Sequence, residues 1–524
     1  MGLLGIPLIL LSPPALCLCA ILLVGLIAFL NKTLRKPLLL QRQFNSGGIR
    51  GPPYQFIYGN ALEIRRLTTE SMAKPMSSLS HDICGRLVPH VSAWTEKYGR
   101  NFVFWLGPEP TLIVLEPELV KLMLNDKERV YSKAEPTEYL RKLLGDGLVT
   151  SRGEKWAKMR KLANHAFQAE SLKFFFSQNM IPAMIASTEI MLERWNNHEG
   201  EEIEVFGEFK LLTSEVISRT AFGSSYLQGK LIFEMLTELA ILVAKNTFII
   251  RLPVLSKIYR TRDEIEAEKL KRGVRDLIIA MVRKRENMVT SGELDSYGGD
   301  FLGLLLKAHH EVDESKKISV DDLVDECKTF YIGGQETTNM LLTWAVLLLS
   351  MHTEWQEQAR KEVVTHFGSQ TPDPDGISKL KNMSMIINET LRLYPPVLAM
   401  MRKTDKEVRL GNFTIPSNTN IRVPNLPLHH DPEIWGEDVH LFKPERFSEG
   451  IAKATNSVPS AYIPFGMGPR VCAGFNFAAV EAKIALSMIL QRYSFTLSPA
   501  YIHSPTSTLT LHPQHGVQIV LHAL

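Results

Sequence analysis

Residues 465–474 near the C-terminus, FGMGPRVCAG, contain the side chain best suited to chemistry, the thiol of Cys472. The glycines and the proline predict a tight, irregular loop, and a long helical pattern begins directly after it. A sulfur near a helix N-terminus meets unpaired N–H groups and the positive end of the helix dipole, which favour a thiolate. Such a thiolate is a good axial ligand for haem iron, and Arg470 can neutralise a haem propionate. An isolated cysteine is usually a buried small hydrophobe, but the whole run favours ligation.

A second run, residues 333–338 (GGQETT), lies midway in another long helical pattern. A glycine inside a helix costs about 1 kcal/mol relative to alanine, so two in a row indicate that something approaches the backbone closely. Thr337 follows Gly333 by four positions, and its hydroxyl can donate to the Gly333 carbonyl and bend the helix. The groove that results has room for dioxygen beside a hydroxyl and the carboxylate of Glu336. Taken alone, however, the run is better explained as a helix kink with a solvated Glu336.

Together the two runs resemble those of a known family. The pattern F-x-x-G-x-R-x-C-x-G at residues 465–474 resembles the haem-binding signature of the cytochrome P450 monooxygenases, which is among the more specific short motifs known. The resemblance extends over nearly the whole chain from Gly51 onward. It implies heme b (iron protoporphyrin IX) as the cofactor, with Cys472 as the iron ligand. It also implies that Thr337 and its acidic neighbour Glu336 are the catalytic residues that activate oxygen.

The same resemblance gives a structural role to Glu389 and Arg392, whose spacing places them on one face of a predicted helix. This spacing is common on solvated helix faces and alone indicates nothing. With Arg446 of the downstream sequence PERF (444–447), the pair is similar to the structural triad of the family. The resemblance therefore implies a role for these three residues in fold stability and haem incorporation, and not in catalysis.

Haem carries two propionates, which need cationic partners. Residues 156–160 (WAKMR) place an indole N–H donor and a guanidinium about one helical turn apart, and resemble the WxxxR element of the family. Arg402, ten residues after Arg392, matches another propionate-binding arginine. The resemblance thus implies six cofactor-binding residues, namely Trp156, Arg160, Arg402, Phe465, Arg470 and Gly474.

Mostly helical elements are predicted to position these residues. Apolar side chains recur at helical spacing in four segments: 172–196, 263–288, 319–350 and 475–493. The third can be capped by Ser319, with Asp322 three residues later. Strand-like runs occur in three short segments: 102–115, 407–416 and 517–521. Because nothing marks a boundary between independent domains, we predict one catalytic domain over residues 54–524, mainly α with small β-sheets, as in the cytochrome P450 fold.

Residues 1–31 differ from the rest of the chain. No Asp, Glu, Lys or Arg occurs in residues 1–30, and residues 15–30 are almost entirely aliphatic, which suits a helix that crosses a membrane. Pro13 and Pro14 are expected to kink or shorten the helical part. A cleaved secretory signal is the alternative. The segment lacks a basic start and is followed by basic residues from Lys32 onward, which favours an uncleaved transmembrane anchor.

The flanking charges also predict where the protein lies. Positive flanks tend to stay in the cytoplasm, so we expect a single-pass anchor in the endoplasmic reticulum membrane and a catalytic domain that faces the cytosol. Residues 32–53 are basic and then rich in Pro and Gly, and are expected to form a hinge between anchor and domain. The chain has 5 cysteines and no CxxC spacing, which fits a reducing compartment.

Charge and motif content indicate the partners. A net charge of +3 is too mild to favour nucleic acid, so none is expected. The chain contains no flavin or nicotinamide fingerprint, and the resemblance implies that a separate NADPH-cytochrome P450 reductase supplies electrons. Lys155, Lys158 and Lys161 can form a basic face for an acidic electron donor, although a solvated face explains them equally well. Membrane lipid, O2 and a small apolar substrate complete the expected partners.

The resemblance implies a haem-thiolate monooxygenase that inserts one oxygen atom from O2 into a small apolar molecule. Three runs, residues 51–54 (GPPY), 333–338 and 435–438 (WGED), are similar to the plant clan that oxidises triterpenoids, brassinosteroids, gibberellins and cytokinins. An isoprenoid-derived or hormone-like substrate is therefore expected. By family layout, the pocket walls come from four segments: 136–148, 248–254, 330–334 and 397–401. Two alternatives remain: an isomerase or dehydratase of the same fold that does not use O2, disfavoured by the presence of Thr337, and a non-catalytic haem-binding protein.

Overall fold

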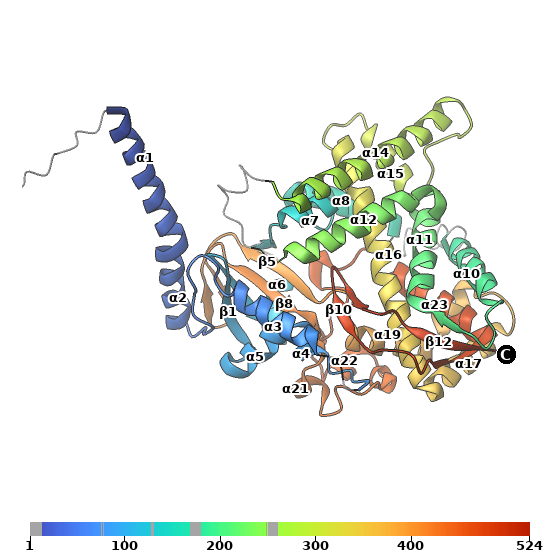
Figure 1. Cartoon of the computed structure of the whole chain (residues 1–524). Coiled ribbons are helices and arrows are strands. Elements are labelled where there is room, and N and C mark those ends of the chain that lie inside the picture. Colours follow the sequence, from blue (N-terminus) through green and yellow to red (C-terminus); the bar gives the residue numbers. More distant parts are fainter. Residues whose placement is uncertain are drawn as a thin grey trace, which may run out of the picture.

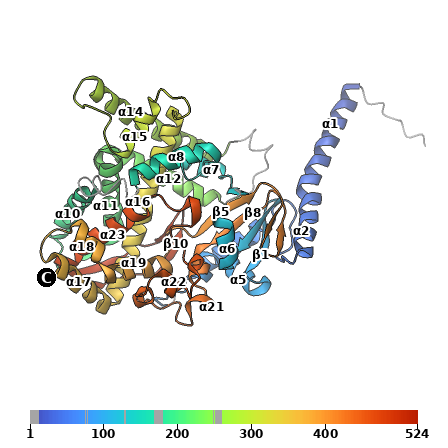
Figure 2. The same ribbon diagram turned by 180° about the vertical axis from the view of Figure 1, so that it is seen from behind.

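Helices form most of the described chain, as predicted. The computed structural model describes residues 13–524, except for residues 75, 77, 127–129, 168–179, 248 and 250–259. The largest sheet lies at the end of the body from which helix α1 (Pro13–Leu30) projects, and the C-terminus lies at the opposite end (Figures 1 and 2). The predicted class, mainly α with small β-sheets after one apolar N-terminal helix, is confirmed.

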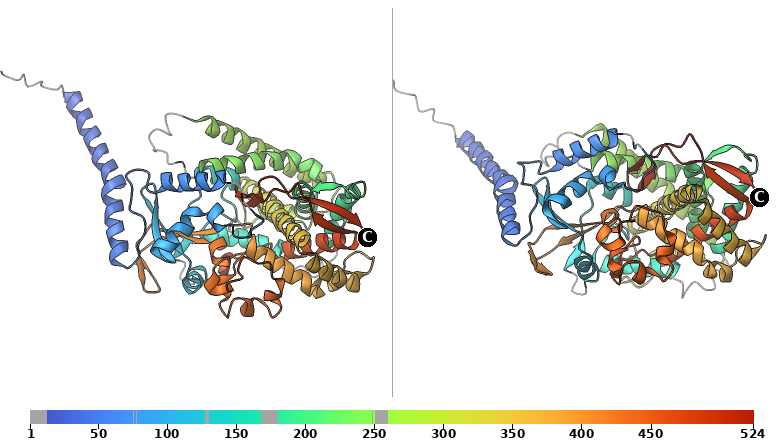
Figure 3. Two further views of the ribbon diagram at one scale, coloured as in Figure 1. Left: turned by 60° about the horizontal axis from the view of Figure 1, so that its bottom comes forward. Right: turned by 90° about the horizontal axis from the view of Figure 1, so that it is seen from below.

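Helix α16 (Val320–Met351) runs through the middle of the body (Figures 1 and 3). Its predicted cap is confirmed: the Ser319 N–H donates to Asp322 Oδ2 at 3.0 Å, and the Asp322 N–H donates to Ser319 Oγ at 3.1 Å. Helix α11 (Val205–Phe222) packs along α16. A Cβ on Gly334 would lie 2.5 Å from Cδ1 of Ile217, so only glycine permits this close approach of the two helices.

Other helices surround α16 and agree with the sequence pattern. The predicted helices 263–288 and 475–493 are confirmed as α14 (Arg262–Thr290) and α23 (Phe475–Arg492). Of the predicted helix 172–196, residues 172–179 lie outside the described residues, and the rest contains α10 (Ile181–Trp195). Two further helices carry residues of interest, α8 (Gly153–Phe167) and α19 (Lys381–Leu393).

The five-stranded sheet joins strands that are distant in the sequence. Its order is β1-β2-β8-β5-β3, with bounds Asn101–Leu106, Glu109–Val114, Asn420–Pro424, Ala399–Thr404 and Tyr131–Lys133. Neighbouring strands are antiparallel except for β2 and β8. Lys133 on β3 pairs directly with Arg402 on β5. Because opposite residues in a sheet point to the same face, these two cationic side chains lie side by side.

Smaller sheets complete the predicted strands. Strand β12 (Gln518–Ala523) lies between β4 (Glu202–Glu204) and β9 (Tyr493–Leu497). Two hairpins follow the same antiparallel pattern, β6–β7 (Val408–Leu410 and Phe413–Ile415) and β10–β11 (Pro505–Ser507 and Leu511–Pro513). All three segments predicted to contain strands, 102–115, 407–416 and 517–521, are confirmed.

Below α16, the predicted triad forms a buried ionic cluster. Arg392 Nε and Nη2 each donate to a different oxygen of Glu389 at 2.7 Å, and both side chains are 0% exposed. The remaining nitrogen of Arg392, Nη1, donates to two backbone carbonyls. One is that of His429, the last residue of α20 (Asn425–His429), at 3.1 Å, and the other is that of Val439 at 2.7 Å. Arg446 Nε lies 3.5 Å from Glu389 Oε1. The cluster thereby ties α19 to the chain that leads into the Cys472 loop.

The N-terminal segment continues further as helix than expected. Helix α1 runs through a π-helical segment, η1 (Asn31–Arg35), into α2 (Lys36–Ser46), so only residues 47–53 of the expected 32–53 hinge are irregular. Tyr54 fastens this helix to the body: its hydroxyl donates to the Thr33 carbonyl, and its N–H donates to Gln41 Oε1 at 3.0 Å. The α1–α2 helix contains an 18-residue window of mean hydropathy 2.5 with no buried residue, which is compatible with a membrane anchor.

Replacement of Glu389 by Gln should destabilise the fold strongly. Glu389→Gln leaves the Arg392 charge buried without its counter-charge, and loss of one partner of a buried pair costs about 3 kcal/mol or more. Glu70→Gln is the matched control, since it breaks an exposed pair with Arg66 worth about 0.5 kcal/mol. Urea unfolding of both variants measures the two losses, and equal midpoints for both would contradict a stabilising role of the buried cluster.

Candidate active site

A tight loop holds Cys472 in front of helix α23. Gly466 (φ +77°) and Gly468 (φ +73°) both have left-handed backbone conformations that favour glycine. A Cβ on Gly468 would lie 2.1 Å from the Leu124 carbonyl oxygen, which excludes larger residues there. The Cys472 N–H donates to the Phe465 carbonyl at 2.9 Å and closes the loop. The predicted irregular loop before a helix is therefore confirmed.

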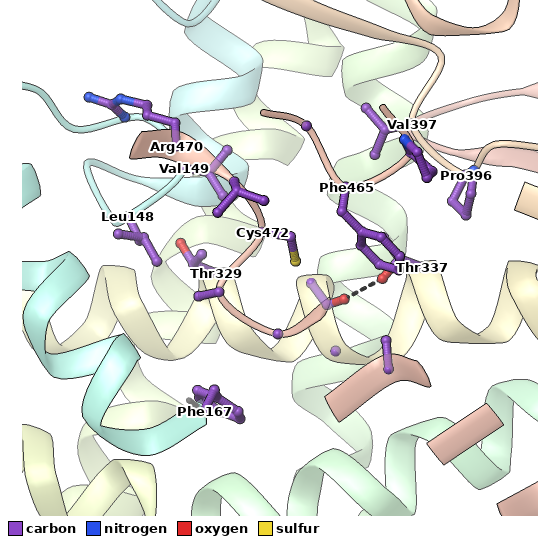
Figure 4. A pocket seen from close by; sticks show the side chains of 18 of the residues that line it. Leu148, Val149, Phe167, Thr329, Thr337, Pro396, Val397, Phe465, Arg470 and Cys472 are labelled. Atoms are coloured by element: carbon purple, nitrogen blue, oxygen red, sulfur yellow. Dashed lines mark hydrogen bonds between the residues drawn. The ribbon is translucent and has the colours of Figure 1, made fainter. Parts of the chain in front are cut away.

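The Cys472 loop faces α16 across a cavity of about 340 Å³, a size typical of ligand pockets. Figure 4 shows the sulfur of Cys472 pointing towards α16. Nine residues were predicted from the sequence to be catalytic, to bind the cofactor or to bind iron. Eight of them line the cavity: Trp156, Arg160, Thr337, Arg402, Phe465, Arg470, Cys472 and Gly474. The exception is Glu336, whose carboxylate accepts a hydrogen bond from the Thr510 hydroxyl at 2.8 Å.

On the α16 side, the two glycines have different surroundings. The Thr337 hydroxyl donates to the Gly333 carbonyl at 2.7 Å, which confirms the predicted bond (Figure 4). A Cβ on Gly333 would meet no atom within 4 Å, and the residue is open to the cavity. The close approach predicted from the glycine pair occurs at Gly334, on the side of α11. The helix thus offers an open backbone and a hydroxyl oxygen directly opposite Cys472.

Four cationic side chains line the cavity, and no acidic side chain is found among the described residues of its lining. They are Lys133, Arg160, Arg402 and Arg470. Burial, followed by the charges of the nearby Arg402 and Arg470, lowers the pKa of Lys133 to about 7. Burial, followed by the neighbouring arginines, lowers the pKa of Arg470 to about 10. Desolvated cations that repel one another fit a ligand with two carboxylates at one edge, such as haem.

The cations are also held in place by contacts with the protein. The Arg470 guanidinium lies over the Trp156 ring at 4.4 Å, and its Nη2 donates to the Ser151 carbonyl at 2.9 Å. Arg160 donates to the carbonyl of Val471, next to the cysteine. These contacts link α8 to the Cys472 loop, so Trp156 and Arg160 come to the cavity together, as their spacing predicted.

Opposing influences act on the pKa of the Cys472 thiol. The side chain is open to the cavity but lies deep in the protein. Burial raises the pKa of the thiol, whereas the Gly474 N–H and the charge of Arg160 lower it only in part. Helix α23 begins at Phe475, so its N-terminus also lies close to the sulfur and favours the thiolate. A coordinated metal ion removes this proton directly.

Lys133 is a charged residue of the cavity that sequence reasoning missed. It lies 269 positions from its strand partner Arg402 and carries no local motif, so only the β3–β5 register brings it to the cavity.

Three of the four predicted wall segments contribute to the cavity. The contributing residues are Leu148, Phe330, Gly333, Gly334, Val397 and Met400. Most of the fourth, 248–254, lies outside the described residues.

The predicted basic face is partly neutralised. Lys155 forms ion pairs with Asp146 at 2.9 Å and with Asp322 at 2.6 Å. Lys158 donates to the Lys317 carbonyl at 2.9 Å. Two of the three lysines are thus engaged within the protein, and their helix face is less cationic than the sequence suggested.

Comparison with known proteins agrees with this geometry. The model of the cytochrome P450 family matches residues 82–519. The chain is 56% identical over 508 residues to Cytochrome P450 CYP749A22 of Panax ginseng, covering 97% of this chain and 96% of that protein. It is 38% identical over 499 residues to 7-deoxyloganic acid hydroxylase of Catharanthus roseus (93% and 94%), and 37% identical over 521 residues to Cytochrome P450 734A1 of Arabidopsis thaliana (98% and 97%). The chain belongs to the cytochrome P450 family, and is therefore a haem-dependent monooxygenase.

Proposed function

We propose that heme b occupies the cavity with its iron bound to Cys472, and that the protein hydroxylates an isoprenoid-derived small molecule. The observation that carries this proposal is the position of Cys472 opposite Gly333 and Thr337, across a cavity with four cations. Trp156, Arg160, Arg402 and Arg470 would hold the propionates, while Phe465 and Gly474 would pack against the macrocycle. Lys133, side by side with Arg402, adds a further propionate partner.

Bound haem supplies the activation of O2 and the transfer of one oxygen atom. The residues of this chain then control protons and water. Thr337 donates its hydroxyl hydrogen to Gly333, so its oxygen is free to accept a hydrogen bond in the cavity. Glu336, the next residue, is the acid that passes protons from solvent towards that hydroxyl. The open backbone at Gly333 leaves room for a small molecule beside the Thr337 hydroxyl.

The walls of the cavity support an apolar substrate. Leu148, Val149, Val397 and Met400 line it, and the charged residues of the lining are those assigned to the cofactor. Such walls bind by burial of apolar surface and exclude water from the reaction. Since one similar protein is named 7-deoxyloganic acid hydroxylase, an isoprenoid-derived substrate is the best-supported class.

The cellular setting completes the proposal. Electrons would come from NADPH-cytochrome P450 reductase in the same membrane, because a haem enzyme of this family requires a redox partner. Residues 1–31 would anchor the protein in the lipid of the endoplasmic reticulum, and the basic residues that follow would keep the catalytic domain, residues 54–524, in the cytosol. Residues 47–53, irregular in the structure, would connect the two parts.

Neither alternative function gains support. An isomerase or dehydratase that does not use O2 has no need of the Thr337 hydroxyl, which is present and faces the cavity. A non-catalytic haem carrier has no need of an open apolar space opposite the cysteine. Similar proteins include one named as a hydroxylase, which agrees with a monooxygenase.

Cys472→Ser tests the proposed iron ligand. The reduced protein with carbon monoxide should show the absorbance band of a thiolate-ligated haem, and Cys472→Ser should abolish that band because the sulfur is lost. Cys84→Ser is the matched control, since Cys84 does not line the cavity, and it should keep the band. A Cys472→Ser protein with an unchanged spectrum would refute the assignment.

Thr337→Ala tests the proposed control of protons. This variant should keep haem but divert electrons from NADPH to hydrogen peroxide, and product formed per NADPH should fall by about tenfold or more. Thr337→Ser retains the hydroxyl and should restore most of the yield. The measurement is the ratio of product to peroxide in membranes reconstituted with reductase, and full coupling in Thr337→Ala would count against the role of the hydroxyl.

A binding-spectrum screen tests the substrate class. Purified haem protein titrated with triterpenoids, diterpenoids and apolar hormones should show a shift of the iron from low to high spin, because a fitting substrate displaces water from the cavity. Fatty acids and simple phenols of similar size serve as controls. A shift produced only by the control compounds would exclude the isoprenoid class and leave the haem assignment untouched.

A further inference from the structure

Glu336 is held from outside its own helix. The Thr510 hydroxyl donates to Glu336 Oε1 at 2.8 Å, although 174 positions separate the two residues. Thr510 is buried, with 2% of its surface exposed, whereas Glu336 is half-buried. Within the described part of the chain Glu336 forms no ion pair, so this hydroxyl is the side-chain partner that fixes its direction.

The segment that carries Thr510 is firmly attached. Thr510 lies in the turn of the β10–β11 hairpin, next to Leu511. The Leu511 N–H donates to the carbonyl of Pro396, a residue of the cavity wall, at 3.0 Å. The Leu511 carbonyl accepts from Nε1 of Trp344 on α16, also at 3.0 Å. The hairpin is thus bonded to both the cavity wall and the helix of Glu336, which gives the Thr510 hydroxyl a fixed position.

A fixed carboxylate matters because the neighbouring hydroxyl is already engaged. The Thr337 hydrogen is donated to Gly333, so a proton for the cavity must come from another group. Glu336 is the adjacent acid, but a free glutamate side chain samples many rotamers, and holding it in one costs entropy. A hydrogen bond from a buried, rigid hydroxyl restricts the Glu336 side chain in the folded protein before any substrate binds.

We propose that Thr510 is a positioning residue for Glu336. It holds the carboxylate in one direction outside the cavity lining, next in sequence to Thr337, so that a water molecule can carry protons from Glu336 towards the Thr337 hydroxyl. The proposal rests on the function proposed above, in which Glu336 passes protons. Thr510 keeps its own hydrogen: Glu336 takes a proton from solvent and passes it to a water molecule between its carboxylate and the Thr337 hydroxyl. Loss of the Thr510 hydroxyl leaves Glu336 present but misdirected.

Thr510→Val is the direct test, because valine keeps the shape and removes the donor. In the full-length haem protein reconstituted with reductase, product formed per NADPH should fall by about tenfold, the scale of one hydrogen bond to a charged group. Hydrogen peroxide should rise in proportion. Thr510→Ser keeps a hydroxyl at the same place and should restore most of the yield, which a purely steric role of Thr510 would not predict.

A double-variant comparison shows whether Thr510 acts through Glu336. In a Glu336→Ala background, Thr510→Val should cause no further loss of product yield. The unfolding midpoint in urea gives a readout apart from turnover: Thr510→Val should lower it in the native background more than in the Glu336→Ala background. Additive losses of yield, or a Thr510→Ser protein as impaired as Thr510→Val, would overturn the proposal.

The two proposals fail in different ways. If Glu336→Ala uncouples turnover and Thr510→Val does not, Thr510 has no positioning role, while the proposed function stands. If Glu336→Ala shows the carbon monoxide band of the thiolate ligand and forms as much product per NADPH as the native protein, Glu336 does not deliver protons. Thr510 then has no positioning role either.

Discussion

An excess of positive charge at the cavity is the constraint to which the proposed cofactor must answer, because no acidic side chain of the described lining offsets it. Lys133, Arg160, Arg402 and Arg470 converge on one cavity from different parts of the chain, and the described lining holds no acidic side chain. Burial lowers the pKa of each of the four, and repulsion by neighbouring cations adds to this for Lys133 and Arg470. A ligand with two carboxylates removes this repulsion. The proposed haem would therefore stabilise the folded protein by pairing with these cations, in addition to supplying the chemistry.

Helix α16 combines packing and chemistry within one turn. Gly334 lets α11 approach closely on one side, while Gly333 leaves the other side open to the cavity. Adjacent residues of a helix point in directions about 100° apart, so each of the two glycines meets a different neighbour. The buried pair of Glu389 and Arg392 holds the supporting helix beneath, so the distance between α16 and the Cys472 loop is set by rigid elements.

Local patterns predicted much of this arrangement, and contacts between distant segments explain the rest. The loop at 465–474, the bond from Thr337 to Gly333 and the cap at Ser319 each involve residues within a few positions, so spacing alone was informative. Lys133 and Thr510 reach the site through strand register and a hairpin, which leave no mark on their own neighbours in sequence. For Cys472, motif reasoning considered the helix end, which favours a thiolate, and omitted the burial of the side chain, which raises the pKa of the thiol.

The helix is unbroken from α1 through η1 to α2, so the orientation of its apolar part is coupled to that of the body. Tyr54 bonds to this helix at Thr33 and Gln41, beyond its apolar part. Apolar helices tilt to match the thickness of the bilayer that they cross. With this helix as the proposed anchor, a change in lipid composition that alters its tilt would also rotate the body, and with it the approach to the cavity, relative to the membrane surface. The thickness of the bilayer would thereby influence how apolar molecules dissolved in the membrane reach the cavity.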